Sequence, residues 1–378
     1  MAPAGPSTGT GAKAGELASI QFLRFLASTL VVLFHSEVQL YRLSGGAREN
    51  HVPFASFGTD LFFVISGFIM VYITYNKRTG FSDFMRRRIV RIVPLYWLYM
   101  CALIALWVVW RKAFHSTALD PWHVMASFAF LPYAHPVLGV QQPLMPVGWT
   151  LNYYMSFYLL FAAVLCFRPA ERVAAAGLVL CLLVAAQAII DAPDGPLHFY
   201  GATVQLEFLY GMLVALLVLK VGKGTAWFCI AALAAFAAIF GDGLWLGVSE
   251  GADRALFWGL SAAFLLLGCV LIERRWGWPA DALSQSLGNA SYSIFLSNLF
   301  SLGACGLLLK YLHAYESLGP GLVQAVLVVC AVGAGYGAHL AIEKPLMKRL
   351  SRGAGMSMTR LTRGGAPSVP PVRAFAKQ

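Results

Sequence analysis

The feature that most constrains this chain is a series of ten apolar runs, each about long enough to cross a lipid bilayer as a helix. A transmembrane helix needs roughly 20 predominantly apolar residues to span the hydrocarbon core. Hydrophobic residues fill 59% of the 378 positions and charged residues only 12%, against roughly 25% charged in a soluble domain. The runs cover residues 20–41, 54–75, 92–110, 146–167, 172–191, 201–220, 225–241, 255–273, 287–310 and 321–343. A soluble fold is therefore excluded.

The runs predict helices rather than strands. Strands of a membrane β-barrel alternate apolar and polar residues, whereas these runs are apolar on every side. Residues 121–135 are also apolar, but they are too short and too closely flanked by proline to span. We expect this segment to lie in the membrane interface or to re-enter the bilayer. The predicted fold class is all-α, a polytopic transmembrane helical bundle of about ten spans.

The distribution of basic residues sets the expected orientation. Lys and Arg total 28 against 17 Asp and Glu, a net charge of +11. In a soluble protein this excess would suggest nucleic acid, but in membrane proteins basic residues collect in cytoplasmic loops. With the N-terminus inside, the cytoplasmic segments hold 21 Lys and Arg and the outer segments hold six. We therefore expect both termini in the cytoplasm and no nucleic-acid partner.

Composition divides the chain into three parts. Residues 1–18 are rich in Ala, Gly, Ser, Thr and Pro, a composition typical of disorder, and residues 351–378 form a basic tail that we also expect to be disordered. Residues 19–350 form the transmembrane domain. All seven cysteines fall inside apolar runs without CxxC spacing, so we expect neither a disulfide nor a metal site.

Ionisable residues inside membrane spans are costly and usually functional. Arg24 and His35 share the first span, eleven residues apart. Eleven residues are close to three helical turns, so the two side chains lie on one face, roughly 16 Å apart along the axis. Either each residue pairs structurally with a neighbouring helix, or the two form a functional stripe; their common register favours the second interpretation.

Three features of the first three spans suit activation of a hydroxyl group and binding of phosphate. His35 can take and return a proton near neutral pH, which suits activation of a hydroxyl. Asp60 begins the second span at a similar depth, where a carboxylate can orient the imidazole. Arg86, Arg87, Arg88 and Arg91 stand at the inner end of the third span. They suit phosphate binding, although an orientation anchor explains their spacing equally well.

The same residues resemble a known family. The motifs, in chain order, are Leu23-Arg24 with Leu33-Phe34-His35, Gly58-Thr59-Asp60 through Gly67-Phe68, Phe84-Met85-Arg86 through Tyr96-Trp97, Gly148-Trp149-Thr150-Leu151, Glu207-Phe208, Ser291-Tyr292-Ser293-Ile294 and Glu343-Lys344-Pro345. Together they resemble the acyltransferase-3 family of bacterial membrane O-acyltransferases over about residues 18–350. The resemblance is nearest to the exopolysaccharide O-acetyltransferase branch.

This resemblance implies a function. The expected activity is transfer of an acetyl or similar short acyl group from cytoplasmic acyl-CoA to a glycan hydroxyl, in the bacterial inner membrane. It implies a catalytic role for His35, with Asp60, and donor binding by Arg24 and the four arginines of the third span. Acyl-CoA is then a co-substrate, and no cofactor or metal is bound permanently. The expected partners are acyl-CoA, a glycan or lipid-linked sugar, the lipid bilayer and, in a homo-oligomer, a second copy of the chain.

Two positions depart from the family pattern and bear on the acceptor pocket. Tyr154 stands where the family usually has Glu, and Asn298 stands where it commonly has His. Neither replacement can do the same work, because Tyr supplies no carboxylate at neutral pH and Asn takes up no proton. The residues expected at the acceptor pocket are Trp149, Asn152, Tyr154, Glu207 and Asn298.

Two other functions remain open from the sequence. A glycan transporter or flippase would use the polar stripe of the first span as a pathway. A catalytically degenerate homologue would bind acyl-CoA or glycan without turnover, which Tyr154 and Asn298 favour. The arginine segment favours the acyltransferase, since a flippase needs no cytoplasmic phosphate site. In the last span, Gly333 and Gly337 have a spacing that predicts close helix packing.

Overall fold

The computed structural model describes residues 17–47, 51–111, 119–221, 226–248, 252–279 and 282–353. In these ranges the chain is helical, and a single antiparallel bridge between Ala134 and Gln141 is the only β-type pairing. The all-α prediction is confirmed. Residues 1–16 and 354–378, which hold most of the two segments expected to be disordered, lie outside the described residues.

Fourteen α-helices are found in the described ranges. They are α1 (Ala18–Leu43), α2 (Phe57–Thr74), α3 (Phe81–Val109), α4 (Pro121–Phe128), α5 (Trp149–Ala163), α6 (Pro169–Ile190), α7 (Gly195–Tyr200), α8 (Leu206–Val221), α9 (Ala226–Trp245), α10 (Ala252–Arg254), α11 (Leu260–Trp276), α12 (Ala282–Tyr311), α13 (Ala314–Ala338) and α14 (Lys344–Gly353). Two π-helical turns, Ala255–Gly259 and His339–Glu343, lead into α11 and α14.

Ten of the described helical stretches are long and apolar enough to cross a membrane, which confirms the predicted architecture of about ten spans. The third span differs from the sequence expectation. Its helix begins at Phe81 rather than near residue 92, so the arginine segment Arg86–Arg91 belongs to the first turns of α3. The apolar segment 121–135 forms the eight-residue helix α4 and a loop, and is too short to span.

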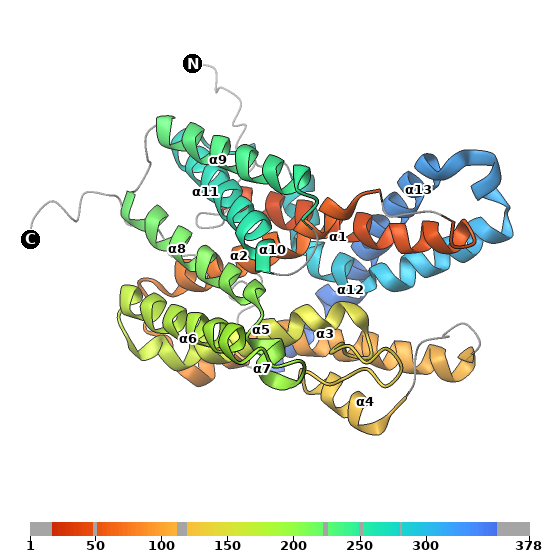
Figure 1. The fold of residues 1–378 in the computed structure, drawn as a ribbon, viewed down its shortest axis with the longest axis horizontal. Coiled ribbons are helices and arrows are strands. Elements are labelled where there is room, and N and C mark those ends of the chain that lie inside the picture. Colours follow the sequence, from red (N-terminus) through yellow and green to blue (C-terminus); the bar gives the residue numbers. More distant parts are fainter. Residues whose placement is uncertain are drawn as a thin grey trace, which may run out of the picture.

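The helices pack around α1, which lies between the α12–α13 pair and α2 (Figure 1). On the far side of α2 stands α8, and α9 packs beside α11. The α2–α8 crossing is close because it has glycine on both sides. A Cβ added to Gly67 would lie 2.0 Å from the Phe208 carbonyl oxygen, and one added to Gly211 would lie 1.9 Å from that of Val64.

The first and twelfth helices run parallel in a fixed register. A Cβ added to Gly288 would lie 2.3 Å from the Gln21 carbonyl oxygen, and eighteen residues further along, one added to Gly306 would lie 3.9 Å from Gln39 Cβ. The offset between the two helices is therefore constant along their length. It places Arg24 level with Ser291 and His35 level with Leu302.

Candidate active site

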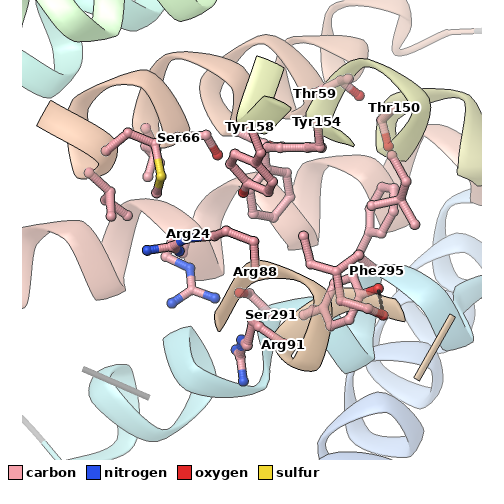
Figure 2. Close-up of a pocket in the computed structure, with 17 residues that line it drawn as sticks. Arg24, Thr59, Ser66, Arg88, Arg91, Thr150, Tyr154, Tyr158, Ser291 and Phe295 are labelled. Atoms are coloured by element: carbon pink, nitrogen blue, oxygen red, sulfur yellow. Dashed lines mark hydrogen bonds between the residues drawn. The ribbon is translucent and has the colours of Figure 1, made fainter. Parts of the chain in front are cut away.

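A partly open cavity of about 150 Å³ lies between five helices (Figure 2). Its walls come from α1, α2, α3, α5 and α12. The lining residues are Arg24, Thr59, Phe62, Ile65, Ser66, Ile69, Met70, Arg88, Arg91, Ile92, Thr150, Leu151, Tyr154, Tyr158, Ser291, Tyr292 and Phe295. Three of them are arginines, and no carboxylate stands among them. The cavity therefore combines apolar and aromatic walls with a concentration of positive charge.

Two of the three arginines have no carboxylate partner in the part of the chain that the structure describes. Arg24 donates from Nη1 to Gln21 Oε1 at 3.3 Å, a contact within its own helix. The guanidinium of Arg88 lies over the rings of Phe84 and Tyr158, at 5.3 and 5.7 Å from their centroids. Its Nε is buried without a hydrogen-bond partner. Arg24 and Arg88 are partly buried. Because a cation withdrawn from water is costly unless an anion compensates it, this part of the cavity favours an anion.

Arg91 has a different environment from the other two arginines. Its Nη1 lies 2.8 Å from Glu343 Oε1, and Glu343 is buried. The other carboxylate oxygen accepts from Ser293 Oγ at 2.7 Å and lies 2.7 Å from His339 Nδ1. The network joins α3, α12 and the π-helical turn after α13, so Arg91 is a positioned and charge-balanced residue at the edge of the cavity.

Aromatic side chains form much of the remaining wall. Tyr154 packs against Phe63 and Tyr158, with centroid distances of 5.3 and 5.9 Å. Tyr292 donates its hydroxyl hydrogen to the Ile92 carbonyl oxygen at 2.8 Å, which ties α12 to α3. Phe62 and Phe295 meet edge to face at 6.0 Å. These rings are held by packing, so the wall has a fixed shape.

His35 stands outside the residues that line the cavity, on the same face of α1 as Arg24 and about three turns further along. Its Nδ1 lies 2.9 Å from the Val31 carbonyl oxygen. Because a carbonyl only accepts hydrogen bonds, Nδ1 must carry the proton. In the neutral ring Nε2 then has a free lone pair, and within the described chain no protein group occupies it. The local helix thus fixes the tautomer whose Nε2 can accept a proton.

Asp60 does not orient His35 in this structure, which corrects the sequence expectation. Both of its oxygens accept from Arg254, at 2.8 Å from Nε and 2.8 Å from Nη2, and Asp60 is fully buried. The physical reason is a stronger partner: a bidentate guanidinium matches a carboxylate in shape and charge. The imidazole Nδ1, in turn, is already engaged by its own helix. Asp60 therefore joins α2 to α10, which precedes the π-helical turn before α11.

The residues expected at the acceptor pocket are only partly brought together. Tyr154 lines the cavity, whereas the other four lie outside the lining. Trp149 packs on Phe63, Asn152 is buried with an unpartnered Oδ1, and Asn298 donates from Nδ2 to the Phe295 carbonyl. Glu207 is buried against Gly259 and interacts with the buried side chain of Asp60.

The arginine segment is also divided by the structure. Arg88 and Arg91 line the cavity, while Arg86 is exposed and Arg87 is partly exposed outside it. Positions three apart share a helical face, which groups Arg88 with Arg91, whereas Arg86, two residues before Arg88, lies on the opposite side of the helix. The sequence spacing gave no preference among the four.

Several cavity residues were absent from the sequence-based set. These residues include Tyr158, Ser66, Tyr292 and Phe295. Ser66 and Tyr292 lie within the family motifs, but apolar or hydroxyl side chains inside a span carry little signal of their own. Glu343 had a clear signal, a carboxylate within the last span, and its partner Arg91 could not be inferred from spacing. Among the described residues, no group of three or more His, Cys, Asp or Glu could hold a metal ion.

Comparison with known proteins agrees with this geometry. Residues 17–339 match the model of an acyltransferase domain, so the chain belongs to the acyltransferase-3 family of membrane acyltransferases. It is 32% identical over 303 residues to a protein of Rhizobium meliloti (strain 1021) named exopolysaccharide production protein ExoZ. That alignment covers 79% of this chain and 92% of the relative. No solved structure matches the chain.

Proposed function

We propose that this protein transfers an acetyl or similar short acyl group from acyl-CoA to a hydroxyl of an exported or cell-surface glycan. Membership of the acyltransferase-3 family supports the reaction class. The name of the Rhizobium meliloti relative, which refers to exopolysaccharide production, supports a polysaccharide or its lipid-linked precursor as the acceptor. In this account the protein lies in the bacterial inner membrane with both termini in the cytoplasm, as the basic loops indicate.

The observation that carries the proposal is a pair of cavity arginines that form no ion pair within the described residues. Arg24 and Arg88 face a common space, and neither has a carboxylate partner in the described chain. Coenzyme A supplies the missing anions through its diphosphate and its ribose phosphate. Guanidinium groups bind phosphate by charge-assisted, often bidentate hydrogen bonds. Aromatic and apolar walls beside the arginines suit the long uncharged arm that carries the thioester.

The proposed chemistry places the thioester near His35. The acceptor hydroxyl oxygen attacks the thioester carbonyl carbon while His35 Nε2 takes the hydroxyl proton. The carbon–sulfur bond then breaks, and the imidazolium returns the proton to the departing thiolate, giving an ester and free coenzyme A. The Val31 carbonyl supports this step because it holds Nδ1 protonated and leaves Nε2 as the base. Acyl-CoA is consumed as a co-substrate, and no permanently bound cofactor takes part.

Measuring the affinity of purified variants for coenzyme A tests the proposed role of Arg24 and Arg88. Arg24→Ala and Arg88→Ala should each weaken the affinity about ten- to hundredfold, since a charge-assisted contact contributes about 1.5–3 kcal/mol. The control is Arg87→Ala, which removes a cation of α3 that lies outside the cavity. It should change the affinity for coenzyme A less than about threefold. Parental affinity in both the Arg24 and the Arg88 variants would contradict the proposal.

A further inference from the structure

The last described helix, α14, has one apolar and one basic face. Met347 and Ser351 are 2% and 1% exposed, and Leu346 packs against the main core. The opposite side of the helix is exposed and basic. It consists of Lys344, Lys348, Arg349 and Arg352. Three of these, spaced four residues apart, form a single stripe along the helix. We call these four residues the α14 basic face.

The α14 basic face begins beside the cavity. Lys344 directly follows Glu343, whose carboxylate holds the cavity-lining Arg91 at 2.8 Å. The helix continues from that point and packs against α3, which carries the arginine segment. At 1.5 Å per residue, Arg352 lies roughly 14 Å along the axis from Glu343. The whole face therefore lies within about one to two Debye lengths of the cavity edge at 0.1 M salt.

The four side chains are not engaged by the rest of the described chain. None of them forms an ion pair or side-chain hydrogen bond within it. Like charges one turn apart repel each other slightly and destabilise a helix. The apolar face of α14 already fixes the helix to the bundle, so the basic face contributes nothing to that attachment. The positive charge of the α14 basic face is therefore available to a negatively charged partner outside the described chain.

We propose that the α14 basic face captures the polyanionic acyl donor and guides it into the cavity. This inference rests on the proposed function, and it assigns donor encounter and donor retention to different residues. Exposed charges at the rim of a site change the association rate and its salt dependence, whereas buried charges that contact the ligand change the dissociation rate. The α14 basic face consists of exposed charges and should affect the association rate, whereas Arg88 lines the cavity and should affect the dissociation rate. The competing occupant, the phosphates of anionic lipids, shares the same chemistry and is tested separately.

The experiment is a stopped-flow measurement of coenzyme A binding to the full chain in nanodiscs of neutral phosphatidylcholine. Lys344→Gln with Lys348→Gln should lower the association rate about three- to tenfold at low salt, within the range by which steering raises such rates. The difference should vanish near 0.5 M salt, where charges are screened. A matched pair, Arg168→Gln with Lys220→Gln, removes two exposed cations at the ends of α6 and α8 and should leave the rate unchanged.

The remaining outcomes separate the two proposals. Arg88→Ala should raise the dissociation rate of coenzyme A in the same assay. If it does so while the variant with both Lys344 and Lys348 replaced binds coenzyme A at the parental association rate, only the role of the α14 basic face is overturned. If coenzyme A binds neither parent nor variants, the proposed function itself fails. An association difference that appears only in nanodiscs containing anionic phosphatidylglycerol would assign the face to lipid and overturn the inference.

Discussion

At the scale of single residues, Tyr154 shows how one departure from a family pattern changes the cavity. Its ring lines the wall between Phe63 and Tyr158, in the same space as Arg24 and Arg88. Tyr154→Glu would place a carboxylate beside two unpaired guanidinium groups. We expect coenzyme A affinity to fall about tenfold, because the new carboxylate competes with the donor phosphates. Binding and thermal midpoint would be measured together.

The matched control is Tyr154→Phe, which keeps the ring and removes the hydroxyl. It should bind coenzyme A within about threefold of the parent. Because Tyr154 faces the cavity and not hydrocarbon, the two variants should have similar thermal midpoints; a charge facing lipid would cost a few kcal/mol. A large loss of stability in the glutamate variant alone would contradict the assignment.

At the scale of elements, the glycines that matter are those at helix crossings. The spacing of Gly333 and Gly337 predicted close packing, but a Cβ at either position would meet no neighbouring helix within 4 Å in the described part of the chain. That prediction is wrong for contacts within the chain, because spacing does not report which face of α13 meets a neighbour. On α13 the close approach is at Gly335, where an added Cβ would lie 2.6 Å from Ile294 Cα, and a closer one occurs between α2 and α8, where Gly211 stands against backbone.

This difference gives a stability prediction. Gly211→Ala should destabilise the folded bundle by about 1–3 kcal/mol through overpacking, because the added carbon would lie 1.9 Å from the Val64 carbonyl oxygen. Gly337→Ala meets open space and should be neutral or slightly stabilising, as alanine favours a helix. Thermal unfolding in detergent compares the two. Equal midpoints would show that the α2–α8 crossing can relax.

The segment between α3 and α5 should respond to pH through His135. Its Nδ1 accepts from the backbone N–H groups of Val137 and Leu138, at 3.2 and 3.3 Å. Burial, and then the neighbouring His123, lower the pKa of His135 below its ordinary value of 6.5. The unfolded segment therefore binds a proton more readily than the folded one. Local stability should be complete above about pH 6.5 and decline as the pH falls through the lowered pKa.

Amide hydrogen exchange of residues 121–142 checks this expectation. Exchange should be faster at pH 5 than at pH 7 after correction for the intrinsic rate. In His135→Gln the side-chain amide oxygen can accept a hydrogen bond but does not titrate, so the additional exchange at low pH should disappear. Persistence of the effect in that variant would contradict the role of His135.

At the scale of the whole molecule, the sequence predicted the helical class and the number of spans well, because length and apolarity act locally along the chain. It also predicted the common face of Arg24 and His35, which follows from the helical period. The convergence of five helices on one cavity was not predictable from periodicity. Neither were the Asp60–Arg254 and Arg91–Glu343 pairs. These depend on packing between segments far apart in the chain, and a single sequence does not encode such contacts in any local pattern.

The start of α3 shows the same distinction. An apolar window ends where arginines begin, so the expected span started near residue 92. The helix starts at Phe81 because the arginines fit within it: Arg88 and Arg91 turn into the cavity, and Arg86 turns to the exposed side. Arg88 and Arg91, which appeared to end the apolar span, are therefore residues by which α3 contributes to the cavity.

The central claim is that the chain transfers acyl groups and that His35 is the base. The direct measurement is transfer of labelled acetyl from acetyl-CoA to a polysaccharide acceptor by the purified protein and by His35→Gln, with coenzyme A affinity measured in parallel. The account predicts transfer by the parent, and a loss of about 10²–10⁴-fold in the variant with affinity unchanged within about threefold. Transfer by His35→Gln at the parental rate would contradict the catalytic role of His35, and binding without transfer by the parent would identify a donor-binding homologue instead of an enzyme.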